Sequence, residues 1–165
     1  MPEPHRIRLA GPWQIQVRGS RMPDEMSLKD IPLIAALESR KWQVPIQSAD
    51  VVAELKPMDW GLPALKSQHL QIEAVRGFHC PNGLSESSQV VLDVQFQETI
   101  GQVRLNGNSL KLLEDSPTRR RFDVTHCLPH GFNRLEVSLF EIAENAPNRG
   151  ISELTAVVLE IFEHS

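Results

Sequence analysis

VVLDVQF (residues 90–96) opens the stretch, residues 90–142, that decides the fold of this chain. In VVLDVQF, alternate residues are apolar, a period of two that is typical of a strand with one buried face. The next segment is QVRLNGNSLKLL (102–113), in which Asn106-Gly107 lies between two apolar runs. Because an Asn-Gly pair tolerates the positive φ angles of a tight turn, this segment predicts a β-hairpin.

The stretch closes with RFDVTHCLPHGFNRLEVSLFEI (121–142). Its last strand should point Leu135, Val137 and Leu139 to one side and the intervening Arg134, Glu136 and Ser138 to the other. Alternation of this kind predicts one face on a core and the other face in water. The segments 90–142 therefore predict an all-β protein, an antiparallel β-sandwich.

Further strands are predicted on both sides of this stretch. Pro45 should keep one of them, KWQVPI, at a sheet edge or end. ELTAVVLEIF is apolar on both faces, as expected of a strand that is covered from both sides. The predicted strands outside 90–142 are WQIQVRG (13–19), KWQVPI (41–46), the segment 69–80 and ELTAVVLEIF (153–162).

Residues 20–42 break the β pattern, and residues 27–42 within them predict a short helical insertion. A Ser27 to Asp30 pattern resembles a capping box, and Pro32 places the helix proper near Ile31. Eight or nine strands without an internal repeat or a linker predict a single domain over residues 1–165, and this number of strands suits a jelly roll.

Composition sets broad limits on the function. The chain has 165 residues, a net charge of −4 and 41% hydrophobic residues, which is ordinary for a globular protein. The negative charge gives no general attraction to nucleic acid or to an anionic membrane. No secretory signal and no apolar run of about 20 residues is visible, so a cytoplasmic location is the expectation. Cys80 and Cys127 are then expected to be reduced, buried and inert, with a disulfide left open.

The motifs of the second half resemble a known family. VRLNGNSL followed by RRFDVTHCLPHGFNRLEVSLF is similar to the galactose-binding-like jelly roll that serves as the N-terminal sugar-binding domain of family-2 glycoside hydrolases, such as β-galactosidases and β-glucuronidases. Earlier, VRGFHCP (75–81) and Gly11-x-Trp13 also look like family strands. The matching positions are Leu105-Asn106-Gly107, Phe122-Asp123-Val124-Thr125, Leu128, Gly131, Asn133 and Leu135-x-Val137.

These motifs have a structural explanation. Asp123 and Thr125 can bond nearby backbone amides and start a turn, Leu128 packs, and Gly131 permits a left-handed conformation. The resemblance implies a fold, and several functions share this fold, so the function has to be argued from a site.

Catalysis is not expected. The (β/α)₈ barrel that carries the paired catalytic carboxylates of those hydrolases has no counterpart in this sequence, and glycosidase chemistry needs two carboxyl groups about 5–10 Å apart. A G-x-S-x-G elbow and a phosphate-binding loop are also missing from the sequence. We therefore expect no enzyme activity and no cofactor.

Sugar-binding surfaces stack an aromatic ring on the pyranose and use amides and charges to bind its hydroxyls. Trp60, in a Pro/Gly-containing loop, is the first candidate platform and Trp42 the second, with packing under its own loop as the alternative for Trp60. Arg119 and Arg120 belong to the one basic run and are candidates for an acidic sugar or phosphate. The alternative for this run is a solvated loop opposite Glu114-Asp115.

No metal site is predicted. His79-Cys80 and His126-Cys127 repeat a dipeptide, but adjacent residues on a strand point to opposite faces, so each pair could give only one ligand. No dense Asp/Asn loop resembles a calcium motif, although related jelly rolls often hold a structural ion, and the calcium question stays open.

The sequence leaves two alternative functions, which belong to different classes. The first is a non-catalytic carbohydrate-binding module with loops at one end, including Trp60, as its site. The second is a protein-interaction or assembly domain, in which the apolar positions of residues 27–42 or the edge near Pro45 contact a protein partner or a second copy of the chain. Nucleic acid and membrane are not expected partners.

Overall fold

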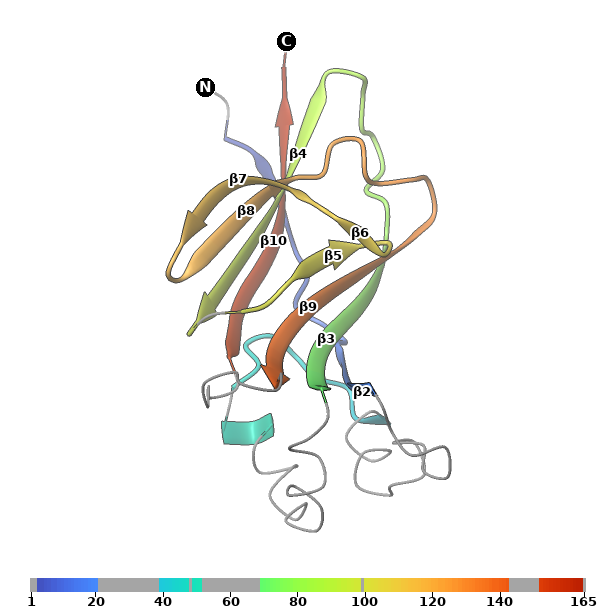
Figure 1. The fold of residues 1–165 in the computed structure, drawn as a ribbon. Helices are drawn as coiled ribbons and strands as arrows, with labels where there is room; N and C mark the ends of the chain where they lie inside the picture. The colour runs from blue at the N-terminus through green and yellow to red at the C-terminus, as the bar shows by residue number, and fades with distance from the viewer. Residues whose placement is uncertain are drawn as a thin grey trace.

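The computed structural model describes residues 3–20, 39–47, 49–51, 69–98, 100–142 and 152–164. In these residues ten strands form two antiparallel sheets of five strands each (Figure 1), with the orders β1-β10-β4-β8-β7 and β2-β3-β9-β5-β6. This confirms the predicted antiparallel β-sandwich. The strands are β1 (His5–Arg8), β2 (Gln14–Ser20), β3 (His69–His79), β4 (Ser88–Gln97), β5 (Val103–Leu105), β6 (Asn108–Ser109), β7 (Lys111–Ser116), β8 (Arg119–Asp123), β9 (Phe132–Ile142) and β10 (Glu153–Glu163).

The core lies between the two sheets and follows the predicted alternation. The inward residues of β4 (Val90, Leu92, Val94 and Phe96) are at most 2% exposed, and those of β9 (Leu135, Val137 and Leu139) at most 1%. Trp13 is fully buried in the same cluster. Burial of this apolar surface is the main stabilising contribution to the sandwich.

The outer face of β9 differs from the prediction that it lies in water. Glu136 and Ser138 are both buried there, and so is Glu73 on the neighbouring β3. Arg104 of β5 explains the burial of the two acids, because its Nη2 lies 3.0 Å from Glu73 Oε1 and 3.3 Å from Glu136 Oε2. Long arginine side chains lie along the sheet and cover the acidic residues beneath them.

The predicted hairpin is confirmed. Asn106 and Gly107 have φ angles of 53° and 80°, the left-handed values that a type I′ turn requires, and they join β5 to β6. β6 has only two residues, because the chain then crosses to the other sheet as β7.

The motif residues of the two quoted segments meet at this turn. Asn133 is fully buried, and its Oδ1 accepts a hydrogen bond of 2.8 Å from Asn106 Nδ2. Asn106 Oδ1 in turn accepts the backbone N–H of Arg134 at 2.8 Å. Gly131, two residues earlier, has a φ of 101°. The motif therefore joins the hairpin turn to the start of β9, which is a structural role.

Asp123 and Thr125 form the predicted turn at the end of β8. Thr125 Oγ1 donates to Asp123 Oδ1 at 2.6 Å, and the Thr125 backbone N–H donates to the same oxygen at 3.1 Å. The hydroxyl hydrogen bond is the main reason why the pKa of Asp123 is lowered from its usual range. Thr125 Oγ1 also accepts the backbone N–H of Val90 at 3.1 Å, which links the turn to β4.

Replacement of Thr125 by valine should reduce stability in a pH-dependent way. A carboxyl whose pKa is lowered on folding contributes stability above its unfolded pKa, about 3.9 for aspartate, and this contribution is lost as the pH falls through the folded value. At pH 7 we expect a loss of about 1.5–3 kcal/mol. Urea unfolding at pH 7 and pH 2.5 should show a smaller difference from the unmodified chain at pH 2.5.

The exposed Thr118 offers a matched control. Thr118→Val should change the free energy of unfolding by less than about 0.5 kcal/mol at both pH values. A Thr125→Val difference that stays constant between pH 7 and pH 2.5 would contradict the role given to the Asp123 carboxylate.

Other segments depart from the sequence prediction. Residues 41–46 form no strand but two isolated bridges, Trp42 with Trp13 and Ile46 with Leu154, because Pro45 has no N–H to donate. The edge strand β1 was not predicted at all. The predicted insertion 27–42 lies outside the described residues except for 39–42. A helix able to span a bilayer is absent from the part of the chain that the structure describes.

Candidate binding site

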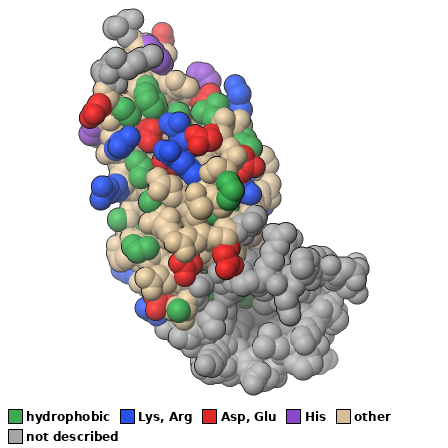
Figure 2. Space-filling model, turned by 90° about the vertical axis from the view of Figure 1, so that its left-hand side faces the viewer, with side chains coloured by type: hydrophobic (Ala, Val, Ile, Leu, Met, Phe, Trp, Pro, Cys, Tyr) green, Lys and Arg blue, Asp and Glu red, His purple; other side chains and the backbone are tan. Residues whose placement is uncertain are grey.

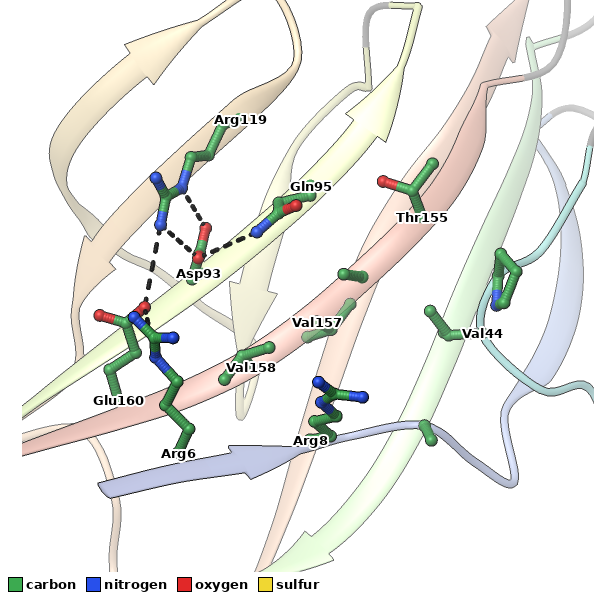
Figure 3. Close-up of a pocket in the computed structure, with 13 residues that line it drawn as sticks. Arg6, Arg8, Val44, Asp93, Gln95, Arg119, Thr155, Val157, Val158 and Glu160 are labelled. Atoms are coloured by element: carbon green, nitrogen blue, oxygen red, sulfur yellow. Dashed lines mark hydrogen bonds and ion pairs between the residues drawn. The ribbon is translucent and has the colours of Figure 1, made fainter. Parts of the chain in front are cut away.

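A pocket of about 570 Å³ lies on the outer face of the sheet β1-β10-β4-β8-β7 (Figure 3). The strands β1, β10, β4 and β8 and the segment around Val44 all contribute to it. Its lining consists of Arg6, Arg8, Ala10, Val44, Pro45, Asp93, Gln95, Arg119, Thr155, Ala156, Val157, Val158 and Glu160.

The pocket has a polar part and an apolar part, and the polar part is built around an ion pair between β4 and β8. Asp93 occupies an outward position of β4, yet it is only 2% exposed. Arg119 donates to it with two nitrogens, Nε to Oδ1 at 2.8 Å and Nη2 to Oδ2 at 2.6 Å. This hydrogen bonding raises the pKa of Arg119 above its usual value. A bidentate pair of this kind fixes the orientation of both side chains.

Glu160 of β10 is the second buried carboxylate, at 4% exposure. Arg121 is its nearest partner, with Nη2 at 2.8 Å from Oε2. Arg119 Nη2 and Arg6 Nε each lie 3.8 Å from Oε1. Figure 2, which looks from the side of β7 and β8, shows basic and acidic side chains gathered together on this surface.

The pocket also has an apolar part. The pairing of β10 with β4 shifts register between Leu154 and Ala156, and Thr155 lies in this bulge. Bulges redirect side chains, and here Thr155 and Ala156 both line the pocket. Val44 and Pro45 line it from another segment of the chain. The predicted two-sided apolar character of β10 is thus explained in part, because its second face forms pocket surface.

Edge strand β1 contributes two arginines. Ile7 packs partly buried against the core, so Arg6 and Arg8, on either side of it, point to the outer face. Their partners in register on β10 are Glu160 and Val158. Among the residues that the structure describes, the Arg8 side chain forms no ion pair or hydrogen bond, and Figure 3 shows it without one.

Of the four predicted sugar-binding residues, the structure describes Trp42, Arg119 and Arg120, and these three do not share one site. Trp42 is only 4% exposed, its backbone pairs with Trp13, and Arg40 lies over its ring at 4.1 Å, so it presents no open ring face. Trp60 lies outside the described residues. Arg119 lines the pocket.

Arg120 points to the other side of β8 from Arg119. Its Nη1 donates to the Gly101 carbonyl at 2.8 Å, and its guanidinium lies 5.6 Å from the Phe96 ring centre. The alternative prediction, that the basic run Arg119 to Arg121 lies in a solvated loop, is wrong, because these residues belong to strand β8. The ion pairs with Glu114-Asp115 do form, between Arg120 and Asp115 at 3.2 Å and between Arg121 and Glu114 at 3.7 Å.

Sequence reasoning missed Asp93, Glu160, Arg6 and Arg8. The first two had a recognisable signal, since each is an acid within an apolar run, VVLDVQF and VVLEIF. A charge on a central strand is costly to bury without a partner, so two such acids call for basic partners nearby. Arg6 and Arg8 had no such signal, because the short strand β1 was not recognised.

The cysteines and histidines do not form a site within the described residues. Cys80 and Cys127 are both free and half-buried, rather than buried as predicted. No group of three or more potential metal ligands is found in that part of the chain.

In the pocket, Asp93 and Glu160 are each held by an arginine. Such an arrangement offers fixed donors and acceptors to a ligand.

Comparison with known proteins gives a likeness in fold. No protein-family model matches the chain, and neither does any curated protein. Similar solved structures are an FMN-binding beta-glucuronidase from Facaelibacterium prausnitzii L2-6 (16% identity, TM-score 0.54), a Beta-D-Mannosidase from Dictyoglomus thermophilum (14%, 0.53) and a putative beta-galactosidase from Bacteroides fragilis (16%, 0.53).

The alignments cover 98%, 94% and 98% of this chain but only 23%, 22% and 24% of those proteins. The chain thus spans about a quarter of their length or less. At these identities the likeness concerns the fold: this β-sandwich occurs as one portion of glycoside hydrolase chains. The predicted resemblance is confirmed at that level.

Proposed function

We propose that this chain is a non-catalytic carbohydrate-binding module and that the pocket on the outer face of β1, β10, β4 and β8 is its site. The observation that carries the proposal is the bidentate pair of Arg119 and Asp93, at 2.8 and 2.6 Å, inside a pocket of about 570 Å³. Small-molecule pockets have volumes of about 300–1,000 Å³ and combine apolar walls with a few fixed polar groups.

The pocket offers both kinds of contact that a sugar needs. Asp93 also accepts a hydrogen bond from Gln95 at 3.3 Å, so a guanidinium, a carboxylate and an amide are arranged in one network. Groups that hold one another in place bind hydroxyls with a smaller loss of side-chain entropy. Val44, Pro45 and Val158 can contact the C–H surface of a pyranose ring.

The comparisons support binding rather than catalysis. The solved structures of similar fold are named as glycosidases, and the aligned portion is only 22–24% of each. A module of this fold would then bring a sugar to, or hold it beside, chemistry that is carried out elsewhere. The proposed role is the carbohydrate binding predicted from the sequence, but the proposed site is different. It lies on the outer face of a sheet, whereas the sequence predicted loops at one end of the sandwich, including Trp60.

A protein-interaction role is the second candidate, and one observation favours it. Phe132 is 66% exposed, its ring lies over Gly77, and a smaller cavity beside it is lined by Pro12, Lys41 and other residues. An exposed aromatic side chain beside basic residues is common at protein interfaces. Light scattering distinguishes the two roles: a stable dimer that Phe132→Ser abolishes would favour assembly.

Sugar titration tests the proposed site. The chain is titrated with neutral and acidic mono- and disaccharides while the chemical shifts of its backbone amides are recorded. Binding should change the amide shifts of β4, β8 and β10 around Gln95. Gln95→Leu should weaken binding by about tenfold, since one hydrogen bond contributes about 0.5–1.5 kcal/mol and about 1.4 kcal/mol corresponds to a factor of ten.

Gln97→Leu is the matched control, because Gln97 lies on the same strand but outside the pocket lining. It should leave the affinity unchanged. Absence of any perturbation at millimolar sugar, or equal losses in the two variants, would refute the proposed site.

A further inference from the structure

The charges that line the pocket do not cancel. Three arginines, Arg6, Arg8 and Arg119, face two carboxylates, Asp93 and Glu160, so the lining carries one excess positive charge. Arg119 of the lining already takes the shortest contact to Asp93, at 2.6 Å. Arg121, which is outside the lining on the same strand β8, takes the shortest contact to Glu160, at 2.8 Å. The excess charge therefore belongs to β1.

The side chains of the two arginines of β1 form few ion pairs within the described residues, and the one that forms is long. The Arg6 side chain is 65% exposed and lies 3.8 Å from a Glu160 oxygen that is also within 3.8 Å of Arg119. The Arg8 side chain has no ion pair or hydrogen bond within the described residues and borders the pocket. Figure 3 shows Arg6 and Arg8 side by side along β1, opposite the Asp93–Arg119 pair.

Strand geometry lets this pair act together. Residues two apart on a strand share one face and lie about 6.6–6.8 Å apart along it, within the reach of two long side chains that converge on one anion. The planar guanidinium matches a carboxylate through two parallel N–H donors. A ligand carboxylate at the β1 rim would pair with the excess charge, while the rest of the pocket holds its hydroxyls.

We propose, resting on the carbohydrate-binding role, that the pocket selects acidic sugars and binds a hexuronic acid residue with its carboxylate at Arg8 and Arg6. A hexuronic acid differs from the corresponding hexose only in the carboxylate at C6. Glucuronic acid and glucose, or galacturonic acid and galactose, therefore form matched ligand pairs that isolate the contribution of β1.

The test compares these ligand pairs by titration calorimetry at low salt. We expect each uronic acid to bind about tenfold more tightly than its hexose, and the preference should weaken in 0.5 M NaCl, where exposed charges are screened. Arg8→Gln should remove the preference, because the uronic acid should lose about tenfold more affinity than the hexose. Lys111→Gln, an equal charge change on the exposed edge strand β7 outside the pocket, should keep the preference.

The outcomes separate this inference from the function on which it rests. Equal affinity for uronic acid and hexose, or a preference that survives Arg8→Gln, would overturn the acidic-sugar proposal and leave carbohydrate binding in place. Acetate or sulfate that competes as well as the uronic acid would overturn it too, by revealing a simple anion site. Binding of neither sugar would overturn both proposals.

Discussion

Replacement of Trp13 by alanine is expected to lower the free energy of unfolding by about 3–5 kcal/mol, the usual cost of removing a buried tryptophan. Trp13 is fully buried between the sheets. Its indole Nε1 donates to the Leu9 carbonyl at 2.8 Å, and its backbone exchanges two hydrogen bonds with Trp42, at 2.7 and 2.8 Å. The alanine variant would leave both a cavity and an unsatisfied Leu9 carbonyl.

Urea unfolding, followed by circular dichroism, measures this loss. Leu112→Ala is the control, because Leu112 is 47% exposed on β7 and should cost less than about 1 kcal/mol. Trp13→Phe should fall between the two, since it keeps an aromatic ring but loses the N–H donor. Similar losses for Trp13→Ala and Leu112→Ala would contradict the position of the core.

The fold could be predicted because its signals are local. The alternation in 90–96 decides which residues face the core, and Asn106-Gly107 alone specifies a tight turn with positive φ angles. Asp123 and Thr125 bond within two residues of each other. Each of these signals depends on neighbours in the sequence, so it can be interpreted without knowing the topology.

The candidate site could not be predicted in this way, because its contacts are long-range. Asp93 and Arg119 are 26 residues apart, and Arg6 contacts Glu160 across almost the whole chain. A run of three arginines gives no indication that its first member turns to one side of a strand and its second to the other. Only the order β1-β10-β4-β8 brings these four side chains to one face.

Replacement of Arg119 by methionine should impair both stability and binding. Removal of one partner of a buried ion pair costs about 3–5 kcal/mol when both groups are buried, and because the Arg119 side chain is 36% exposed we expect about 2–3 kcal/mol. Asp93 would keep only the Gln95 contact at 3.3 Å. Sugar affinity should fall by more than tenfold, measured by calorimetry below the unfolding transition.

A second variant separates the two effects. In Asp93→Leu/Arg119→Met the Asp93 carboxylate is no longer left buried without its arginine. Replacement of an ion pair by apolar side chains is often neutral, so most of the lost stability should return. Sugar binding should not return, because the pocket still lacks the Arg119 guanidinium and the Asp93 carboxylate. Arg120→Met, which alters the neighbouring residue on the opposite side of β8, should leave affinity unchanged. A double variant that binds sugar as well as the unmodified chain would mean that the Asp93–Arg119 pair only stabilises the sheet and that the ligand site lies elsewhere.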